Sequence, residues 1–507
     1  MTDEFLIVRN VSKSFSGVQA LKEVNLVIRR GEIRCLVGEN GSGKSTLIKL
    51  IAGVEVPDAG DIFISGKPYP RLHPIDAIRE GIQVIYQDFS LFPNLTAAEN
   101  LAFNYQLEQN RRLVNWKNIY AIARNAISNI GVAIDLDARV EDLSVADKQM
   151  IAISRALLHE ARLIIMDEPT TALTRREVEA LFRVIKKLQS EGLSILFVSH
   201  KLDEVLEISE KVTILRNGRN VADGDTPDFD RAKLVFHMTG REINETVYSF
   251  EPSPDEQPLL SVSNLSRKGS FAEVSCKLFP GEILGITGLL GSGRTELAMA
   301  LFGLRPATSG SITVEGKRVR LASVDDAIRN GIGYVPEDRL TEGLFFQQSI
   351  GNNVIAGIID RIRGAFGLVR AEQKRSHIDQ WIANLRINTP SPFLPVQSLS
   401  GGNQQRVVLA RWLATAPRIL ILNGPTVGID IGSKADIHRT IRELAGQGIG
   451  VIIISDDIPE VVQNCNRILL MERGRIVEEF IGSAVSEREL TERMIGSAVI
   501  SGERVAN

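Results

Sequence analysis

The sequence predicts an α/β protein of two tandem units, each with a parallel-sheet core, an antiparallel β subdomain and a helical subdomain. Three observations support this fold class. The chain repeats a set of landmarks in the same order, short apolar runs alternate with segments of helical periodicity, and one apolar run in each repeat leads into a glycine-rich loop. Buried strands that alternate with helices are typical of parallel sheets. At 507 residues the chain is also too long for one hydrophobic core.

The internal repeat divides the chain. Residues 37–46 (VGENGSGKST) are echoed by residues 287–296 (TGLLGSGRTE), an offset of 250 (294 − 44). Residues 163–170 (LIIMDEPT) are echoed by residues 419–426 (ILILNGPT), an offset of 256 (423 − 167). The same order at a nearly constant offset indicates a duplication, and the proline-rich, acidic segment 251–258 is typical of a linker. The expected parts are a first domain over 1–243, a linker over 244–260 and a second domain over 261–507.

The periodicity of the first repeat predicts its elements. Apolar residues alternate over 5–11 and 24–28, which indicates half-exposed antiparallel strands. Residues 33–37 form a short apolar run before a glycine, so we expect a buried strand that feeds the glycine-rich loop. Residues from about 96 to 160 have a helical pattern, which predicts a helical subdomain. Further buried strands are expected over 82–86, 163–166 and 195–198, and the helix after the loop carries Leu47, Ile48, Leu50 and Ile51.

Composition limits the classes of protein that the chain can represent. The chain has 59 basic and 62 acidic residues, so it lacks the basic excess that nucleic-acid binding favours, and we expect no nucleic-acid partner. Cys35, Cys276 and Cys465 lie far apart without C-x-x-C spacing, which fits a reducing compartment. The acidic N-terminus, MTDEFLIVRN, does not resemble a signal peptide, and no apolar run reaches the roughly 18–20 residues of a membrane span. Any membrane role would be exercised from the cytoplasmic side through a partner.

The first glycine-rich loop has the complete phosphate-binding pattern G-x-x-x-x-G-K-S. Glycines allow backbone N–H groups to surround phosphates, and the following helix adds its positive end. Lys44 would reach the β- and γ-phosphates of ATP, and the Ser45 hydroxyl would ligate Mg²⁺. A glycine-rich turn with an incidental lysine is the alternative, and the position between a buried strand and a helix argues against it. The expected phosphate contacts are Gly38, Glu39, Asn40, Gly41, Ser42, Gly43, Lys44, Ser45 and Thr46.

Polar residues that follow three of the predicted strands complete a catalytic set. Asp167 and Glu168 end an apolar strand, where one carboxylate holds Mg²⁺ through water and the next polarises the attacking water. His200 follows the strand 195–198 and would contact the γ-phosphate. Gln87 follows the strand 82–86 and would sense Mg²⁺ or the attacking water. Outside this constellation, a lone histidine or glutamine is more often structural.

Residues 399–406, LSGGNQQR, resemble the signature motif of ATP-binding cassette (ABC) proteins, and the resemblance covers nearly the whole chain. It implies two tandem ABC-type nucleotide-binding domains that face each other head to tail, with ATP held between the phosphate loop of one and the signature of the other. The signature would then donate backbone N–H groups and a hydroxyl to the γ-phosphate. The family also implies an aromatic residue that stacks on adenine and an aspartate supplied across the interface. The residues that match these roles are Phe15 for adenine, Ser400, Gly401, Gly402 and Asn403 for the signature, and Asp430 for the aspartate.

The two composite sites that this resemblance implies differ in their chemistry. The site built on Lys44 has every expected group, which predicts one hydrolytic site. The other has lost nearly all of them, which predicts a structural or regulatory role. Its changes are Arg294 for Lys44, Glu337 for Gln87, Asn423 for Asp167, Gly424 for Glu168, Asp456 for His200, Thr174 for Asp430, no aromatic residue over 266–269, and Ser144-Val145-Ala146-Asp147 as its signature.

The Arg-Thr-Glu loop at 294–296 and the segment GYVPEDR at 333–339 resemble the ATP-binding subunit of bacterial ribose/galactose/xylose-type importers. This resemblance implies an ATPase that couples hydrolysis to uptake of a monosaccharide or related polyol or nucleoside. Its partners would be membrane permease subunits, paired as a dimer in that family, and a periplasmic or lipoprotein solute-binding protein. The chain would lie on the cytoplasmic face of the inner membrane. The chain departs from the family at Asn423, Gly424 and Asp456.

Two other classes of tandem-cassette protein are expected to have different features. A ribosome-associated ATPase would carry two intact sites and a long charged linker, and a DNA-repair ATPase would insert a long coiled coil or zinc modules. The sequence shows neither set of features. It does not specify the transported solute, because specificity in the resembled class belongs to the permease and the binding protein.

Overall fold

The computed structural model describes residues 3–15, 18–108, 115–171, 173–242, 248–250, 253, 255–363 and 369–502. The chain forms two compact units, Met1–Ile243 and Asn244–Asn507. Part of the predicted linker (244–247, 251, 252 and 254) lies outside the described residues. Within that linker, Tyr248 belongs to the second unit, because its hydroxyl donates to the carbonyl of Gly281 at 3.0 Å and its carbonyl accepts from the Asn466 amide at 2.7 Å. The linker boundaries otherwise stay a prediction.

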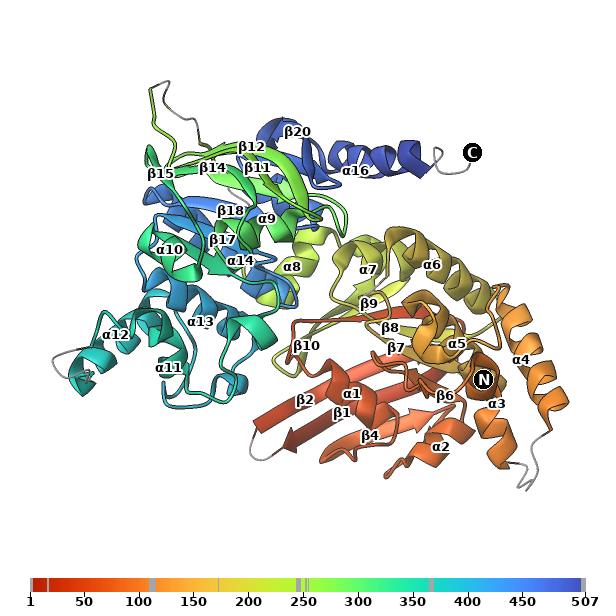
Figure 1. The fold of residues 1–507 in the computed structure, drawn as a ribbon. Helices are drawn as coiled ribbons and strands as arrows, with labels where there is room; N and C mark the ends of the chain where they lie inside the picture. Colours follow the sequence, from red (N-terminus) through yellow and green to blue (C-terminus); the bar gives the residue numbers. More distant parts are fainter. Residues whose placement is uncertain are drawn as a thin grey trace. The chain divides into compact units, whose positions relative to one another are not determined.

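The first unit contains two sheets (Figure 1). The smaller sheet is antiparallel and has the order β2(Val18–Arg29)-β1(Glu4–Phe15)-β4(Ala59–Ile64)-β5(Lys67–Pro68). The larger has the order β10(Arg219–Asp225)-β9(Lys211–Arg216)-β3(Ile33–Val37)-β8(Ser194–Val198)-β7(Leu163–Asp167)-β6(Ile82–Ile85) and is parallel except for β10. Both sheets confirm the predicted parallel core and antiparallel subdomain.

Eight helices are described in the first unit. They are α1(Lys44–Ile51), α2(Pro74–Arg79), α3(Ala97–Glu108), α4(Trp116–Ile130), α5(Val145–Leu158), α6(Arg175–Ser190), α7(Leu202–Ile208) and α8(Arg231–Thr239). Helices α3, α4 and α5 share an apolar cluster that includes Leu101, Ala123 and Ile151. This cluster confirms the predicted helical subdomain.

Three predicted elements differ from the structure in extent. Strand β2 spans Val18–Arg29, where the sequence pattern indicates only 24–28, because it pairs with the whole length of β1. Strand β1 continues to Phe15, well beyond the predicted end at Val11, because its pairing with β2 resumes after register shifts at Val8/Val11 and Val11/Lys13. Strand β6 stops at Ile85, and its Gln83 and Val84 are only half-buried, because β6 is the edge strand of the large sheet. The buried strand expected over 82–86 is therefore shorter and less buried than predicted.

The second unit repeats the first strand by strand. Its small sheet has the order β12(Phe271–Leu278)-β11(Leu260–Arg267)-β14(Ser309–Val314)-β15(Lys317–Val319). Its large sheet has the order β16(Ile332–Val335)-β17(Ile419–Asn423)-β18(Gly450–Ile454)-β13(Ile283–Thr287)-β19(Arg467–Glu472)-β20(Arg475–Ile481). The helices are α9(Arg294–Leu301), α10(Val324–Arg329), α11(Ile350–Ile355), α12(Ala371–Asn384), α13(Gly401–Leu413), α14(Ile431–Gly446), α15(Ile458–Asn464) and α16(Glu487–Gly502).

The register of the sheets fixes the correspondence between the two units. Asp167 pairs with Val198 at the end of β7 and β8, and Asn423 pairs with Ile454 at the end of β17 and β18. Asn423 therefore occupies the place of Asp167, and the residues that follow correspond one to one. Because β3, β7 and β8 are adjacent and parallel, their carboxyl ends meet at one edge of the sheet, where ligands bind in open α/β sheets.

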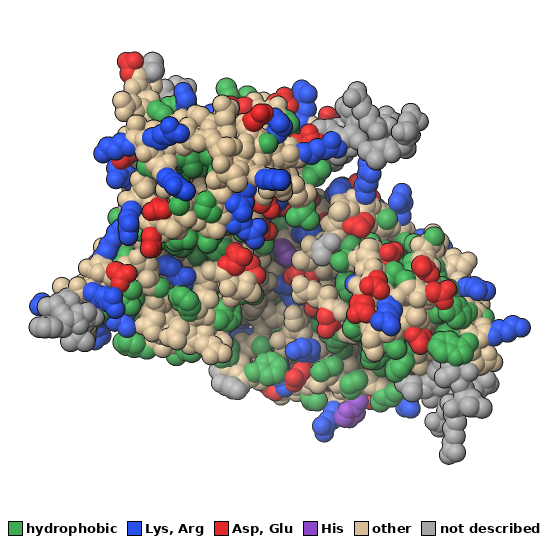
Figure 2. Space-filling view, viewed as in Figure 1, with side chains coloured by type: hydrophobic (Ala, Val, Ile, Leu, Met, Phe, Trp, Pro, Cys, Tyr) green, Lys and Arg blue, Asp and Glu red, His purple; other side chains and the backbone are tan. Residues whose placement is uncertain are grey.

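Within the described residues, no helix combines the length and the apolar character needed to span a membrane. Acidic and basic side chains are interspersed on the visible face of each unit (Figure 2). This mixture fits the formal net charge of −3.

Candidate nucleotide-binding sites

The loop between β3 and α1 needs its glycines for two physical reasons. Gly41 and Gly43 have φ of 79° and 105°, in the left-handed region that favours glycine. At Gly38, an added Cβ would lie 2.4 Å from the backbone oxygen of Leu215 and 2.5 Å from the Ser42 hydroxyl. The loop thus forms a cradle whose floor has no room for a side chain.

Polar groups line this cradle. Lys44 is 6% exposed, and its ammonium donates to the carbonyls of Gly38 at 2.7 Å and Glu39 at 3.0 Å. The buried Ser42 hydroxyl has no hydrogen-bond partner among the described residues. Ser45 is exposed and Thr46 is half-buried in the first turn of α1. A buried cation, a hydroxyl without a partner among the described residues, and the N–H groups of a helix start together suit a phosphate group.

A stability prediction follows from the glycine contacts. Gly38→Ala places a methyl group against backbone, so we expect it to lower the free energy of unfolding by about 2–3 kcal/mol, as overpacking does. Gly41→Ala is the matched control, because its Cβ meets nothing within 4 Å and adds only the backbone cost of about 1 kcal/mol at a φ of 79°. Urea unfolding of the full chain measures both. Equal losses for the two variants would contradict the steric argument.

The carboxylates lie at the same edge of the sheet. Asp167 ends β7, and Glu168 follows it with a left-handed φ of 50°. Glu168 Oε1 lies 3.0 Å from His200 Nδ1, which follows β8. The hydrogen bond with His200 holds the pKa of Glu168 below its ordinary value despite burial. Burial, and then the neighbouring Glu168 charge, raise the pKa of Asp167, while Lys44 opposes this rise. The structure therefore brings Lys44, Asp167, Glu168 and His200 together.

A buried carboxylate, Glu204, contacts the loops that carry Glu168 and His200 and was not predicted from the sequence. Glu204 accepts hydrogen bonds from the hydroxyls of Thr170 at 2.5 Å and Ser199 at 3.5 Å, and it lies 3.3 Å from the Lys201 ammonium. Lys201 also donates to the Thr170 carbonyl at 2.8 Å. Glu204 thus ties the loop after β7 to the loop after β8. The signal that could have found it is its echo, Glu460, which lies 256 residues later (460 − 204) and binds Thr426 and Ser455.

The remaining predicted residues of the first unit lie at the surface. Gln87 is exposed two residues beyond the end of β6. Phe15 ends β1, is 39% exposed, and has the Lys13 ammonium 5.2 Å from its ring centroid. The Phe15 ring is thus accessible for stacking, as an adenine-binding aromatic residue must be.

The signature residues and Asp430 are connected within the second unit. Ser400 is the exposed N-cap of α13, and its hydroxyl accepts from the Asn403 amide at 3.0 Å. Asp430 caps α14 by accepting from the Ser433 N–H at 2.8 Å and hydroxyl at 3.0 Å. An added Cβ on Gly402 would lie 2.1 Å from the Ser433 hydroxyl. Ser433, which the sequence reasoning missed, therefore links Asp430 to the signature glycine. Gly401 packs beside the Arg339 guanidinium in the same region.

The second glycine-rich loop has the same shape and different chemistry. Gly291 and Gly293 have φ of 80° and 95°, close to their counterparts in the first loop. Arg294 begins α9 in the place of Lys44, and its guanidinium contacts Asp456 at 3.2 Å. Gly424 keeps the left-handed backbone of Glu168, with φ of 57°, but carries no side chain. The losses predicted from the sequence thus coincide at one edge of the second sheet.

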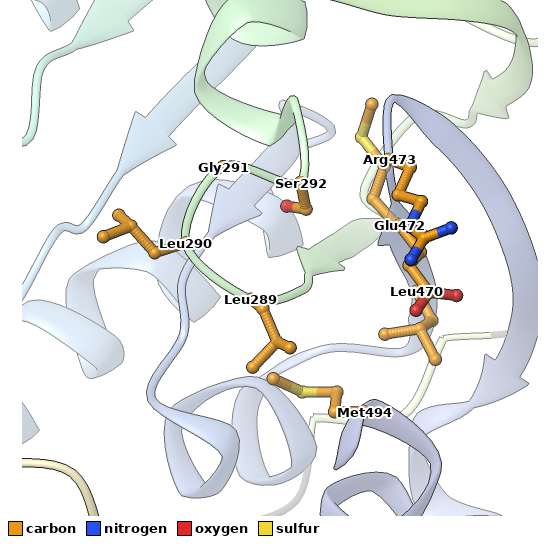
Figure 3. A pocket seen from close by; sticks show the side chains of 9 residues that line it. Leu289, Leu290, Gly291, Ser292, Leu470, Glu472, Arg473 and Met494 are labelled. Atoms are coloured by element: carbon orange, nitrogen blue, oxygen red, sulfur yellow. The ribbon is translucent and has the colours of Figure 1, made fainter. Parts of the chain in front are cut away.

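A pocket of about 190 Å³ lies beside this second loop (Figure 3). Leu289 and Leu290 stand on the loop where the first loop has Glu39 and Asn40. Leu289 points toward Met494 of α16, and Leu290 points away and is 94% exposed. The second loop has therefore replaced polar positions by apolar ones as well as losing its lysine.

Comparison with protein families agrees with this geometry. The model described as ABC transporter matches residues 21–171 and 271–427, one segment in each unit. The chain belongs to the ABC transporter family. The match confirms the predicted resemblance and the predicted fold class, two tandem ABC-type nucleotide-binding domains. ABC proteins of this kind are ATPases, so the chain is an ATPase.

Relatives within the ABC family match nearly the whole chain. A putative ribose/galactose/methyl galactoside import ATP-binding protein of Ralstonia nicotianae is 40% identical over 494 residues, 97% of this chain and 95% of that protein. The ribose import ATP-binding protein RbsA of Caldanaerobacter subterraneus is 38% identical over 501 residues, 99% and 100% of the two chains. The crystal structure of the ADP conformation of an ABC transporter cassette is 25% identical, with a TM-score of 0.42, and the match covers 47% of this chain and all of that one.

Proposed function

We propose that this chain hydrolyses ATP at its first phosphate loop to drive solute import through a separate membrane protein. The observation that carries the proposal is the meeting of Lys44, Asp167 and the Glu168–His200 pair at one edge of the first sheet. At the corresponding edge of the second unit, Asn423 and Gly424 offer no carboxylate. One loop thus has the groups that split a phosphoanhydride bond, and the other does not.

The proposed reaction uses the groups of the first unit in sequence. The cradle from Gly38 to Thr46 binds the β- and γ-phosphates, and Lys44 exchanges its bonds to loop carbonyls for bonds to phosphate oxygens. Glu168 orients the attacking water and accepts its proton. His200 Nδ1 lies 3.0 Å from the Glu168 carboxylate, and the histidine would face the γ-phosphate. Gln87 lies beyond β6 and would respond to the attacking water or the metal.

The donor set fits a magnesium ion that arrives with the nucleotide. Ser45 offers an exposed hydroxyl next to Lys44, and Asp167 is a partly buried carboxylate whose charge interacts with that of Lys44. The described residues hold no group of three or more His, Cys, Asp or Glu side chains able to hold a metal ion. The remaining ligands would be phosphate oxygens and water, as Mg²⁺ prefers. When bound, the ion would neutralise charge on the phosphates.

The second unit is proposed to complete the first site. Ser400, Gly401, Gly402 and Asn403 at the start of α13 would meet the γ-phosphate from the opposite side, with Asp430 next to them, and Phe15 would stack on adenine. The contacts that support this proposal lie within the second unit. Ser400 occupies the N-cap position of α13 without a side-chain capping bond to it, and the first N–H groups of a helix lack partners within that helix. Ser433 holds Asp430 close to Gly402.

Sugar import is supported by the relatives, whose names describe import ATP-binding proteins for ribose, galactose and methyl galactoside. The partners would be a permease, two copies of which would bind near Gln87 and Glu337, and a solute-binding protein outside the membrane. The chain would sit peripherally on the inner membrane. The ribosome-associated alternative has no support among these relatives. Co-purification with a tagged permease from membranes tests the proposal, and sedimentation with ribosomes instead would contradict it.

A positioning role for Glu204 can be tested against its echo. Glu204→Gln weakens the tie between Thr170 and the Ser199–Lys201 loop, so we expect kcat to fall about 10-fold with KM for ATP little changed. Glu460→Gln makes the same change in the second unit, where Glu460 binds Thr426 and Ser455. We expect both variants to lower the melting temperature by similar amounts. We expect Glu460→Gln, however, to leave kcat within about 2-fold of the native value. Equal kcat losses for both variants would make Glu204 merely structural.

A further inference from the structure

The second phosphate loop already contains an ion pair. Arg294 is 7% exposed, and its Nη1 donates to the carbonyl of Gly288 at the start of the loop. Its Nη2 lies 3.2 Å from Oδ2 of Asp456, which follows β18. The two residues are 162 positions apart (456 − 294), so the sheet brings them together. The guanidinium is buried and the Asp456 side chain is 62% exposed, which places the carboxylate at the open side of the loop.

The corresponding residues of the first unit are paired differently. His200, the counterpart of Asp456, contacts Glu168, and Lys44 donates to the loop carbonyls of Gly38 and Glu39. In the second unit Gly424 has no side chain for residue 456 to contact. Asp456 is instead bound to the cation of the loop. The two replacements, Arg294 for Lys44 and Asp456 for His200, are therefore in direct contact with each other.

The Arg294–Asp456 ion pair disfavours the binding of a polyphosphate in the second loop. The cation that would attract it is already neutralised by a carboxylate, and an entering phosphate would have to displace that carboxylate and then remain beside it. Asn423 provides no charge to hold a divalent cation that could shield the repulsion. A planar guanidinium also fills more of the cradle than a compact ammonium does.

We propose that Asp456 is a specificity-determining residue that excludes nucleoside polyphosphates from the second phosphate loop by occupying its arginine. The loop is then a phosphate cradle closed by its own side chains. This goes beyond the proposed function, which concerns hydrolysis at the first loop and leaves nucleotide binding at the second undefined. It does not depend on import or on any partner, so either proposal can fail without the other.

The experiment measures nucleotide binding at the second loop of the full-length chain. Lys44→Ala is introduced first to weaken the first loop, and Asp456→Ala is then added. Binding of ATP γ-(4-azidoanilide), whose photoreactive group is attached to the γ-phosphate, is followed by photolabelling, and the labelled peptides are mapped to 288–296 or 38–46. We expect the Lys44→Ala parent to show little label in 288–296, and the Asp456→Ala variant to label there with at least about 10-fold higher affinity.

Asp457→Ala is the matched control. Asp457 is the next residue along the chain and pairs with Lys434 at 3.2 Å, so its loss removes the same charge without freeing Arg294. It should leave the labelling of 288–296 unchanged. Asp456→Asn, which is closer in shape, replaces Asp456→Ala if thermal melting shows that the alanine variant is unfolded.

Two outcomes would overturn the proposal. One is labelling of 288–296 in the parent at an affinity that neither Asp456 variant improves. The other is an equal gain from Asp457→Ala, which would assign the effect to net charge and not to release of Arg294. A gain confined to the Asp456 variants would support it.

Discussion

Lys44→Ala is expected to lower the steady-state ATPase rate of the assembled complex by about 10²-fold or more. The ammonium is the buried cation of the first cradle, where it binds the Gly38 and Glu39 carbonyls and is placed to reach phosphate oxygens. Removing one positioned donor to a developing charge costs about 10²–10³ in rate. Phosphate release from the purified complex with its permease measures the effect.

Arg294→Ala is the matched control, because Arg294 has the same position in the second loop. Its guanidinium is bound to Gly288 and Asp456, so we expect its loss to leave the ATPase rate within about 2-fold. Thermal melting of both variants separates loss of activity from loss of folding. A fall of equal size in the two variants would refute the division of labour between the loops.

Glu168→Gln is expected to reduce hydrolysis by about 10²–10⁴-fold, the range that a general base contributes, while ATP binding is retained. The amide keeps the size of the carboxylate but cannot accept a proton from water. Its oxygen can still accept a hydrogen bond from the His200 ring, 3.0 Å away in the native protein. Filter binding of ATP and single-turnover hydrolysis on the same sample measure the two properties separately.

The control for Glu168→Gln is the acidic residue of the second unit that corresponds to Gln87. Glu337→Gln removes an exposed carboxylate next to Gly424, whose added Cβ would lie 3.0 Å from Glu337 Cγ. We expect single-turnover hydrolysis to stay within about 2-fold of the native rate. Hydrolysis that survives Glu168→Gln would mean that another group activates the water.

The elements closest to the first site could be predicted because local chemistry determines them. The run 33–37 is buried at every position, and the glycine pattern that follows leads into α1 at Lys44. These features depend on neighbouring residues, and short-range patterns record them well. The extent of β1 and β6 was less predictable, because pairing with β2 extends the first strand and the edge position of the second leaves it half-buried.

The residues that the sequence reasoning missed act across long separations. Ser433 matters because its hydroxyl lies against Gly402, 31 positions earlier (433 − 402). Glu204 matters because Thr170 and Ser199 meet only at the adjacent ends of β7 and β8. A motif marks the residues that contact ligand, but the buried residues that hold them in place leave a weaker pattern.

By itself the sequence determined the duplication, the fold class and which of the two loops keeps the groups for hydrolysis. Those features reside in residue identity and spacing, which can be compared between the repeats. Only the tertiary structure decided that Arg294 and Asp456 are partners, and that Gly424 retains the left-handed backbone of Glu168 without its side chain. The physical reason is that parallel strands bring distant chain segments to one edge of the sheet. There the partner of Asp456 depends on the neighbouring side chains, and Gly424 offers none while Arg294 offers a cation.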